Sequence, residues 1–312
     1  MAGLLLLCLL WSVDSLRSDL FPHFAPTRVP LLESEAVGLI LLALATGIFA
    51  VSRRAQWPRG IQLWTAAAVG LGLFALPAVL LSLAKSWIPG GTRVAIFSLA
   101  PLFAVVLEPH LNVDPKIVNF ATVDSRIAQP PTAGLLAALA AIAGTLCVFP
   151  LQLPASIEAF AATGAVIAAA ASIAVANCVA VQQARALQPK SIAPMAAIAG
   201  TAAAVVQAIA CAFTESATLQ PAALLPELGH AVAVDLPGLL LLFWLMCRIS
   251  AARMMTRFLL APLFTILIAL VLEPAQIGLR GATGLLLIAA GAAWLVFAPA
   301  DEPNTGSLSL ND

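Results

Sequence analysis

The chain alternates long apolar runs with short breaks that contain proline, glycine or charged residues. Most runs approach the roughly 20 apolar residues that an α-helix needs to cross a membrane. The runs do not alternate apolar and polar residues, as the strands of a membrane barrel do. The pattern therefore predicts an all-α polytopic membrane protein. Its ten predicted helices lie at 3–20, 30–51, 61–83, 90–107, 132–150, 155–182, 191–213, 229–249, 252–272 and 281–299.

The first predicted helix is the one that charges interrupt, at Asp14, Arg17 and Asp19. Its apolar run resembles that of a secretory signal peptide. No basic residue precedes the run, however, and no Ala-x-Ala cleavage pattern follows it. We therefore interpret this segment as a retained membrane helix.

The distribution of lysine and arginine predicts the orientation. With the N-terminus in the cytoplasm, ten basic residues fall on the cytoplasmic side of the predicted helices and five on the outer side. Basic residues are enriched in cytoplasmic loops, so both termini are predicted to be cytoplasmic. The ten are Arg53, Arg54, Arg59, Lys116, Arg126, Arg185, Lys190, Arg248, Arg253 and Arg257, and the five are Arg17, Arg28, Lys85, Arg93 and Arg280.

Three short motifs occur twice, in the same order and at nearly constant offset. They are Leu-Pro-x-x-Leu-Leu at 76–81 and 236–241, Ala-Pro-Leu-Phe at 100–103 and 261–264, and Leu-Glu-Pro at 107–109 and 272–274. Each half then holds five helices, and an odd number makes the second half enter the membrane from the opposite side. The motifs therefore predict an inverted-topology repeat, an architecture common among secondary transporters. The predicted units are a first repeat at 1–150, a second repeat at 151–300 and a short polar cytoplasmic tail at 301–312.

The order and spacing of these motifs resemble the EamA-like branch of the drug/metabolite transporter superfamily. The similar stretches are 257–264, 272–274 and 281–291 in the second half, and 5–12 and 97–103 in the first. The resemblance implies ten helices in two repeats and transport of small metabolites, often by export, across the inner membrane of a bacterium. One departure is that seven residues separate Pro101 from Glu108, whereas eleven separate Pro262 from Glu273. This difference predicts a fourth helix that is shortened or ends differently.

Polar residues inside the first predicted helix share one face, because Trp11, Asp14, Ser15 and Ser18 are spaced at i, i+3, i+4 and i+7. Ionisable groups within membrane helices often mark a transport path. If this face lines a cavity, Asp14 can take up a proton or contact a substrate amine. The alternative is that the segment lies at the membrane surface and Asp14 is simply solvated.

Two further residues are candidates for the cavity, each with a structural alternative. Asn177 can bind substrate or form an interhelical hydrogen bond, and Trp244 can line a cavity or pack against neighbours or lipid. Prolines recur in pairs and can kink their helices, because proline lacks a backbone N–H. The predicted kinks are at Pro77, Pro101, Pro237 and Pro262.

The amino-acid composition limits the classes of function that the chain can have. The chain is 62% hydrophobic and 10% charged, against about 25% charged in soluble domains, and its net charge is zero. Nothing therefore indicates a nucleic-acid partner. No catalytic constellation, phosphate-binding loop or metal-ligand spacing is present, so no enzyme activity, cofactor or metal is predicted.

The leading hypothesis is a secondary permease or exporter that moves a small polar metabolite, such as an amino acid, by alternating access. Its predicted partners are that substrate, possible coupling protons at Asp14 and membrane lipid. The alternatives are a flippase for a lipid-linked carrier and a non-transporting membrane subunit. The sequence makes no prediction about the oligomeric state.

Overall fold

The computed structural model describes residues 1–16, 31–111, 132–152, 154–186, 191–214, 221–272 and 277–297. Every regular element in these ranges is a helix, which confirms the predicted all-α class. Alanine and leucine, which dominate the chain, are among the best helix formers. The predicted tail at 301–312 and the end of the first predicted helix, with Ser18, lie outside the described residues.

Among the described residues, eight helical segments are long and apolar enough to cross a membrane. Four are unbroken or nearly so: α3 (Leu31–Ser52), α9 (Ile157–Ala186), α10 (Ile192–Thr214) and α15 (Leu279–Phe297). Four are composite: α4, η2 and α5 (Ile61–Gly70, Leu71–Ala75, Leu76–Ala84); α6 and α7 (Gly90–Phe97, Ala100–Leu111); α11, η4 and α12 (Pro221–His230, Ala231–Asp235, Leu236–Met246); and α13 and α14 (Ala251–Met255, Arg257–Leu272).

Two apolar helices are shorter, α1 (Ala2–Ser15) and α8 (Thr132–Val148). The 14 residues of α1 extend about 21 Å, less than the roughly 30 Å hydrocarbon core of a bilayer. Large apolar side chains are exposed on the outer faces of several helices, including Ile48, Phe213, Leu286 and Trp294. Such exposure is unfavourable in water and natural in lipid, so helix length, composition and surface together indicate a membrane protein.

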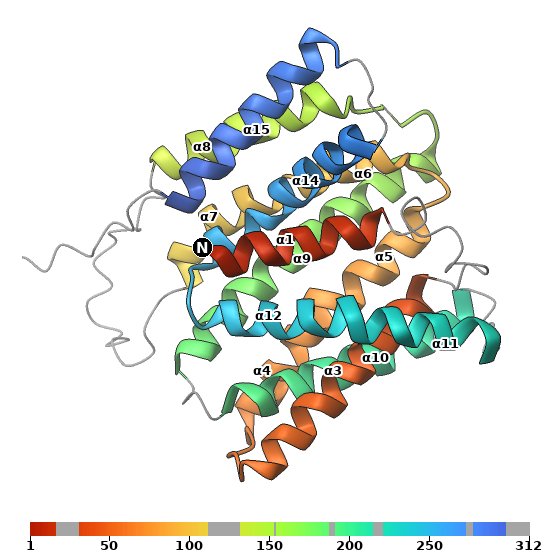
Figure 1. Ribbon diagram of the computed structural model, residues 1–312, viewed down its shortest axis with the longest axis vertical. Coiled ribbons are helices and arrows are strands. Elements are labelled where there is room, and N and C mark those ends of the chain that lie inside the picture. The colour runs from red at the N-terminus through yellow and green to blue at the C-terminus, as the bar shows by residue number, and fades with distance from the viewer. Residues whose placement is uncertain are drawn as a thin grey trace, which may run out of the picture.

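The helices pack in pairs that join distant parts of the sequence. Figure 1 shows α8 beside α15 at one end of the molecule and α3, α4 and α10 at the other. Between these ends, α1 contacts α12 and α14, while α9 contacts α5 and α7. A large core of buried aliphatic and methionine side chains runs through this central region.

Two of the composite segments contain matching π-helical turns. The turns η2 (Leu71–Ala75) and η4 (Ala231–Asp235) each end directly before a Leu-Pro pair, so they occur at the same offset as the repeated motif. A π-helical turn widens a helix locally and is a recognised cause of bending. The interruptions near Pro77 and Pro237 are thus π-turns that precede the prolines.

Of the two alternatives predicted for the fourth helix, the structure contradicts the shortened one, because α7 continues past Glu108 and Pro109 to Leu111, the last residue described in this range. Pro101 and Pro262 each lie eleven residues after the start of their segment, Gly90–Leu111 or Ala251–Leu272, and both segments are helical up to the last residue described there. The side chain of Glu108, within α7, accepts hydrogen bonds from the backbone N–H groups at the start of α13.

Glycines allow the closest helix contacts. A Cβ atom added to Gly144 of α8 would lie 2.6 Å from the carbonyl oxygen of Gly284 in α15, and one added to Gly284 would lie 2.8 Å from that of Gly144. A Cβ on Gly70 would lie 2.1 Å from the carbonyl oxygen of Ala199 in α10. Small residues let membrane helices approach until their backbones touch, which maximises van der Waals packing.

Candidate functional site

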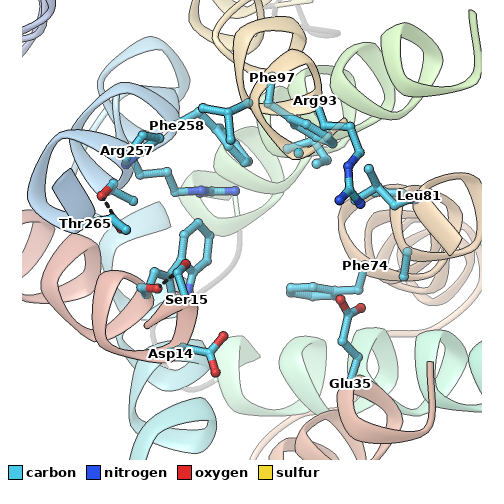
Figure 2. Close-up of a pocket in the computed structure, with 18 of the residues that line it drawn as sticks. Asp14, Ser15, Glu35, Phe74, Leu81, Arg93, Phe97, Arg257, Phe258 and Thr265 are labelled. Atoms are coloured by element: carbon cyan, nitrogen blue, oxygen red, sulfur yellow. Dashed lines mark hydrogen bonds between the residues drawn. The ribbon is translucent and has the colours of Figure 1, made fainter. Parts of the chain in front are cut away.

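A cavity of about 910 Å³ opens among α1, α3, α5, α6, α12 and α14 (Figure 2). Its walls come from both halves of the sequence. Most of the lining is aliphatic or aromatic, and a small set of charged and hydroxyl side chains projects into it. These polar residues are Asp14, Ser15, Ser34, Glu35, Arg93, Asp235, Arg257 and Thr265. A large apolar pocket with a few convergent polar groups is typical of a small-molecule site.

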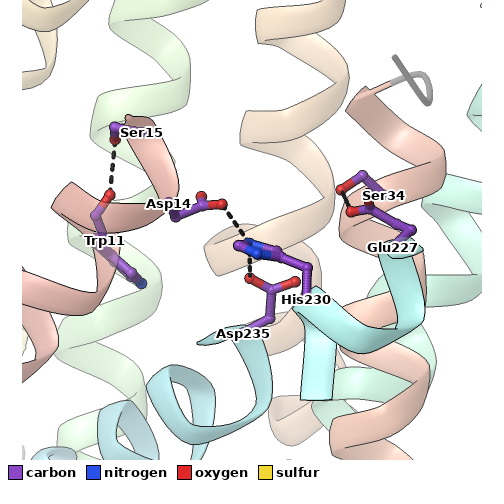
Figure 3. Close-up of polar contacts among 7 residues, drawn as sticks. All are labelled: Trp11, Asp14, Ser15, Ser34, Glu227, His230 and Asp235. Carbon is purple, nitrogen blue, oxygen red and sulfur yellow. Dashed lines mark hydrogen bonds and ion pairs between the residues drawn. The ribbon is translucent and has the colours of Figure 1, made fainter. Parts of the chain in front are cut away.

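Acidic groups occupy one side of the cavity. Asp14 lies at the end of α1, and Asp235 is the last residue of the π-turn η4. His230, at the end of α11, lies between them: its Nε2 atom is 2.8 Å from Asp14 Oδ1 and 3.8 Å from Asp235 Oδ1 (Figure 3). A proton on this nitrogen can therefore form a hydrogen bond with Asp14, and the charge of a protonated ring also lies within ion-pair distance of Asp235. The cluster connects α1 to the distant α11–η4–α12 segment.

The same cluster has the spacing of a cation site. One ligand atom from each of Asp14, His230 and Asp235 lies within 4.8 Å of the other two. The side chain of Asp14 is 48% exposed and that of His230 is 13% exposed, so water reaches one edge of the group. Two carboxylates around one imidazole favour a bound cation, of which the proton is the simplest.

Two further acids on this side are held by neutral partners. Gln207 Nε2 donates a hydrogen bond of 3.0 Å to Glu35 Oε2, and Ser34 Oγ donates to Glu227 Oε1 (Figure 3). Glu35 lines the cavity, whereas Glu227 is almost fully buried behind it. Glu35 and Glu227 thus each accept a hydrogen bond from an uncharged side chain.

Arginine side chains face the cavity from the opposite side, as Figure 2 shows for Arg93 and Arg257. Arg257 begins α14 and is only 2% exposed. Its guanidinium carbon lies 5.0 Å from the ring centroid of Trp11 and 5.0 Å from that of Phe258. Its buried Nε and Nη1 atoms have no hydrogen-bond partner among the described residues, and the same holds for Nε of Arg93.

Aromatic rings form the wall around these arginines. The ring centroids of Trp11 and Phe258 are 6.1 Å apart, and those of Phe97 and Phe258 are 5.7 Å apart in a stacked arrangement. The contacts join α1, α6 and α14 around one end of the cavity. Such rings offer both apolar surface and favourable faces for cations.

Of the residues expected at the site, Trp11, Asp14 and Ser15 line the cavity, as do Pro77 and Pro262. Pro101 and Pro237 are absent from the lining; each lies at the beginning of its helix, α7 or α12.

Asn177 and Trp244 are not brought to the cavity. Asn177 is fully buried, and its Nδ2 atom donates to Met255 Sδ at 3.6 Å, which is the interhelical role considered as the alternative. Trp244 lies about 140° around α12 from the cavity-lining Leu239, at 100° per residue. It is 48% exposed and stacks under Arg248 instead.

Sequence reasoning missed His230, Glu35, Arg93 and Arg257 as site residues. The two arginines were counted as loop charges that set the orientation, but they lie in the cavity wall. Removing them changes the predicted ten-to-five distribution of basic residues to nine-to-four, which keeps the same bias. A usable signal for Arg257 was its position between two apolar runs, four residues before the repeated Ala-Pro-Leu-Phe motif.

Comparison with known proteins gives the fold alone. No family model and no curated protein matches the sequence. A solved structure described as "Crystal structure of protein" is similar with a TM-score of 0.71 over 96% of this chain and 98% of that chain, at 19% sequence identity. The arrangement of helices therefore occurs in another protein over its whole length.

Proposed function

We propose that this protein is a secondary transporter that moves a small polar metabolite, such as an amino acid, across the inner membrane by alternating access. The observation that carries the proposal is the cavity of about 910 Å³, which lies among apolar helices yet has carboxylates on one side and guanidiniums on the other. Charged groups are costly inside a membrane protein and usually mark a substrate or ion path. The resemblance to the EamA-like transporters supports the same function.

The packing of the helices supports an inverted repeat of two five-helix units. If α1, α3, α5, α7 and α8 correspond to α9, α10, α12, α14 and α15, the contacts exchange in pairs. The contact of α1 with α14 corresponds to that of α9 with α7, and the contact of α1 with α12 corresponds to that of α9 with α5. The pairs α3–α10 and α8–α15 map onto themselves. Two such units can rock about a central site.

Transport is tested by reconstituting the purified protein into proteoliposomes and following uptake and efflux of a metabolite panel that includes amino acids, organic acids and amines. At least one compound is expected to cross faster than in empty vesicles. If no compound does so, with or without a proton gradient, the proposal is wrong. Exchange of a fluorescent lipid-linked probe between leaflets, without metabolite flux, would support the flippase instead.

The cluster of Asp14, His230 and Asp235 is our candidate for the proton-coupling site. Asp14→Asn keeps the size and hydrogen bonding of the side chain but removes its charge, and insertion into the membrane is expected to remain normal. Proton-driven transport is expected to fall by at least about tenfold, since the variant loses one of the charged partners of His230. Glu158→Gln, the same change of a carboxylate to an amide at an exposed position outside the cavity lining, is the matched control. Normal proton-driven transport by Asp14→Asn would show that the carboxylate is dispensable.

A further inference from the structure

The two arginines in the cavity wall, Arg257 and Arg93, have no counter-ion among the residues that the structure describes. Among the described residues, no carboxylate lies within ion-pair distance of Arg257 or Arg93, and their buried donor atoms have no acceptor. The acids on the other side of the cavity are already engaged with His230 and Gln207. A buried charge without a partner is strongly unfavourable, so a site that keeps one is usually completed by a ligand.

The surroundings of Arg257 leave its hydrogen-bonding edge for such a ligand. Trp11 and Phe258 lie against the guanidinium at 5.0 Å, and aromatic rings stabilise its positive charge without accepting strong hydrogen bonds. The planar guanidinium presents its N–H donors around its edge, in the fork geometry that matches carboxylate and phosphate oxygens. Its Nε and Nη1 donors, each of which forms one half of a fork together with Nη2, have no partner among the described residues.

Arg93 adds a second positive charge from another helix. It lies on α6, and Figure 2 shows its guanidinium directed into the same cavity as that of Arg257. Phe97, one turn later on α6, stacks on Phe258 between the two arginines' helices. A ligand here meets two guanidiniums beside an apolar aromatic wall.

From this arrangement we infer that the cavity binds an oxyanion, a carboxylate or a phosphate ester, with its oxygens on the N–H edge of Arg257, its charge balanced by Arg93 and its apolar body against Phe97 and Phe258. The inference rests on the proposed function and specifies the substrate class of the same cavity. Guanidinium–oxyanion hydrogen bonds are charge-assisted and bidentate, so this contact is expected to dominate affinity.

The test is a binding measurement on the purified full-length protein in detergent, with tryptophan fluorescence as the readout because Trp11 lies against Arg257. The probes share one aliphatic skeleton and differ in charge: 4-methylpentanoate, 3-methylbutyl phosphate, 4-methylpentanamide and 3-methylbutylamine. None absorbs in the tryptophan band. At least one of the two oxyanions is expected to bind at least about tenfold more tightly than the amide and the amine. The oxyanion that binds more tightly shows whether the site prefers a carboxylate or a phosphate ester.

Substitutions of Arg257 test whether this residue makes the contact with the oxyanion. Arg257→Gln is expected to weaken oxyanion binding by at least about tenfold, and Arg257→Lys to weaken it less, because lysine keeps the charge but loses the fork. Arg248→Gln is the matched control, since Arg248 also stacks on a tryptophan, at 4.7 Å from Trp244, but lies outside the cavity lining. A gel-filtration profile identifies any variant that has not folded, and Arg257→Lys then remains as the second test.

Three results would overturn the inference: neither oxyanion binds at millimolar concentration, the amide or amine binds as tightly as both oxyanions, or folded Arg257→Gln and Arg257→Lys both bind like the unaltered protein. Flux assays on the same preparation separate this inference from the proposed function. Transport of neutral or cationic compounds without oxyanion binding would refute only the oxyanion site. Oxyanion binding without flux of any compound would refute only transport.

Discussion

The guanidinium of Arg257 has no counter-ion among the described residues, so we predict that removing it stabilises the ligand-free protein. Arg257→Met keeps a flexible unbranched stem that reaches about as far as Nε, but it removes the guanidinium that lies against Trp11 and Phe258, with its charge and all of its N–H donors. Replacing buried charged groups with well-packed apolar ones is often neutral or stabilising. In the described part of the chain, no carboxylate would lose an ion pair when Arg257 is replaced.

The magnitude follows from the contacts. Two buried donors without acceptors, Nε and Nη1, each cost about 1–3 kcal/mol, which gives about 2–6 kcal/mol in total. The two cation–π contacts offset part of this cost, at about 0.5–2 kcal/mol each. At the midpoints of these ranges, about 4 kcal/mol of cost against about 2.5 kcal/mol of offset, the free energy of unfolding of Arg257→Met is expected to rise by about 1–2 kcal/mol.

Thermal unfolding in detergent measures the effect. A rise of about 2–5 °C in Tm is expected for Arg257→Met without ligand. Arg248→Met is the control. The guanidinium of Arg248 is exposed to solvent, so its removal does not change the number of buried donors that lack an acceptor. An Arg257→Met protein that unfolds at lower temperature, beside an unchanged control, would show that the guanidinium stabilises the ligand-free fold and would refute this reasoning.

Three further predictions concern packing, capping and topology. Gly70→Ala is expected to lower the free energy of unfolding by about 1–3 kcal/mol, because its Cβ would lie 2.1 Å from a backbone oxygen of α10. Gly164→Ala is the control: its Cβ would meet nothing within 4 Å, so the free energy of unfolding should stay unchanged or rise slightly. Glu108→Ala removes the carboxylate that accepts from the first N–H groups of α13 and should cost about 1 kcal/mol in thermal unfolding experiments. A reporter fused to the C-terminus should be active in the cytoplasm; activity only in the periplasm would contradict the predicted topology.

Run length and hydropathy were sufficient to predict where the helices lie. Each predicted helix overlaps a helical segment of the described residues, and eight of these segments are long and apolar enough to cross a membrane, for which about 20 apolar residues suffice. Run length and hydropathy could not predict where the helices are interrupted within a segment. The π-turn at Ala231–Asp235 and the continuation of α7 through Pro109 leave no mark on the length or hydropathy of the apolar runs.

The site was only partly accessible from the sequence, and the reason differs for each residue. Asp14 was identifiable because an acid with polar neighbours on one face of an apolar helix is a local pattern. Its partner His230 lies 216 positions away, a separation that no local pattern spans. Arg257 was misassigned because rules for orientation count every charge near a helix end as a loop charge, whereas the fold buries this one.

The two proposals about the cavity can be separated because α1 contacts both charged sides through different residues. Trp11 lies against Arg257, whereas Asp14, one turn later, lies against His230, and no ion pair links Asp14 to Arg257 among the described residues. Changing Arg257 should therefore weaken oxyanion binding while leaving the Asp14–His230 contact in place. Asp14→Asn should impair proton-driven transport while keeping oxyanion affinity within a few fold. If each variant instead reduced both properties equally, the two sides of the cavity would act as one site, and the carboxylates would have to be assigned to substrate binding rather than to coupling.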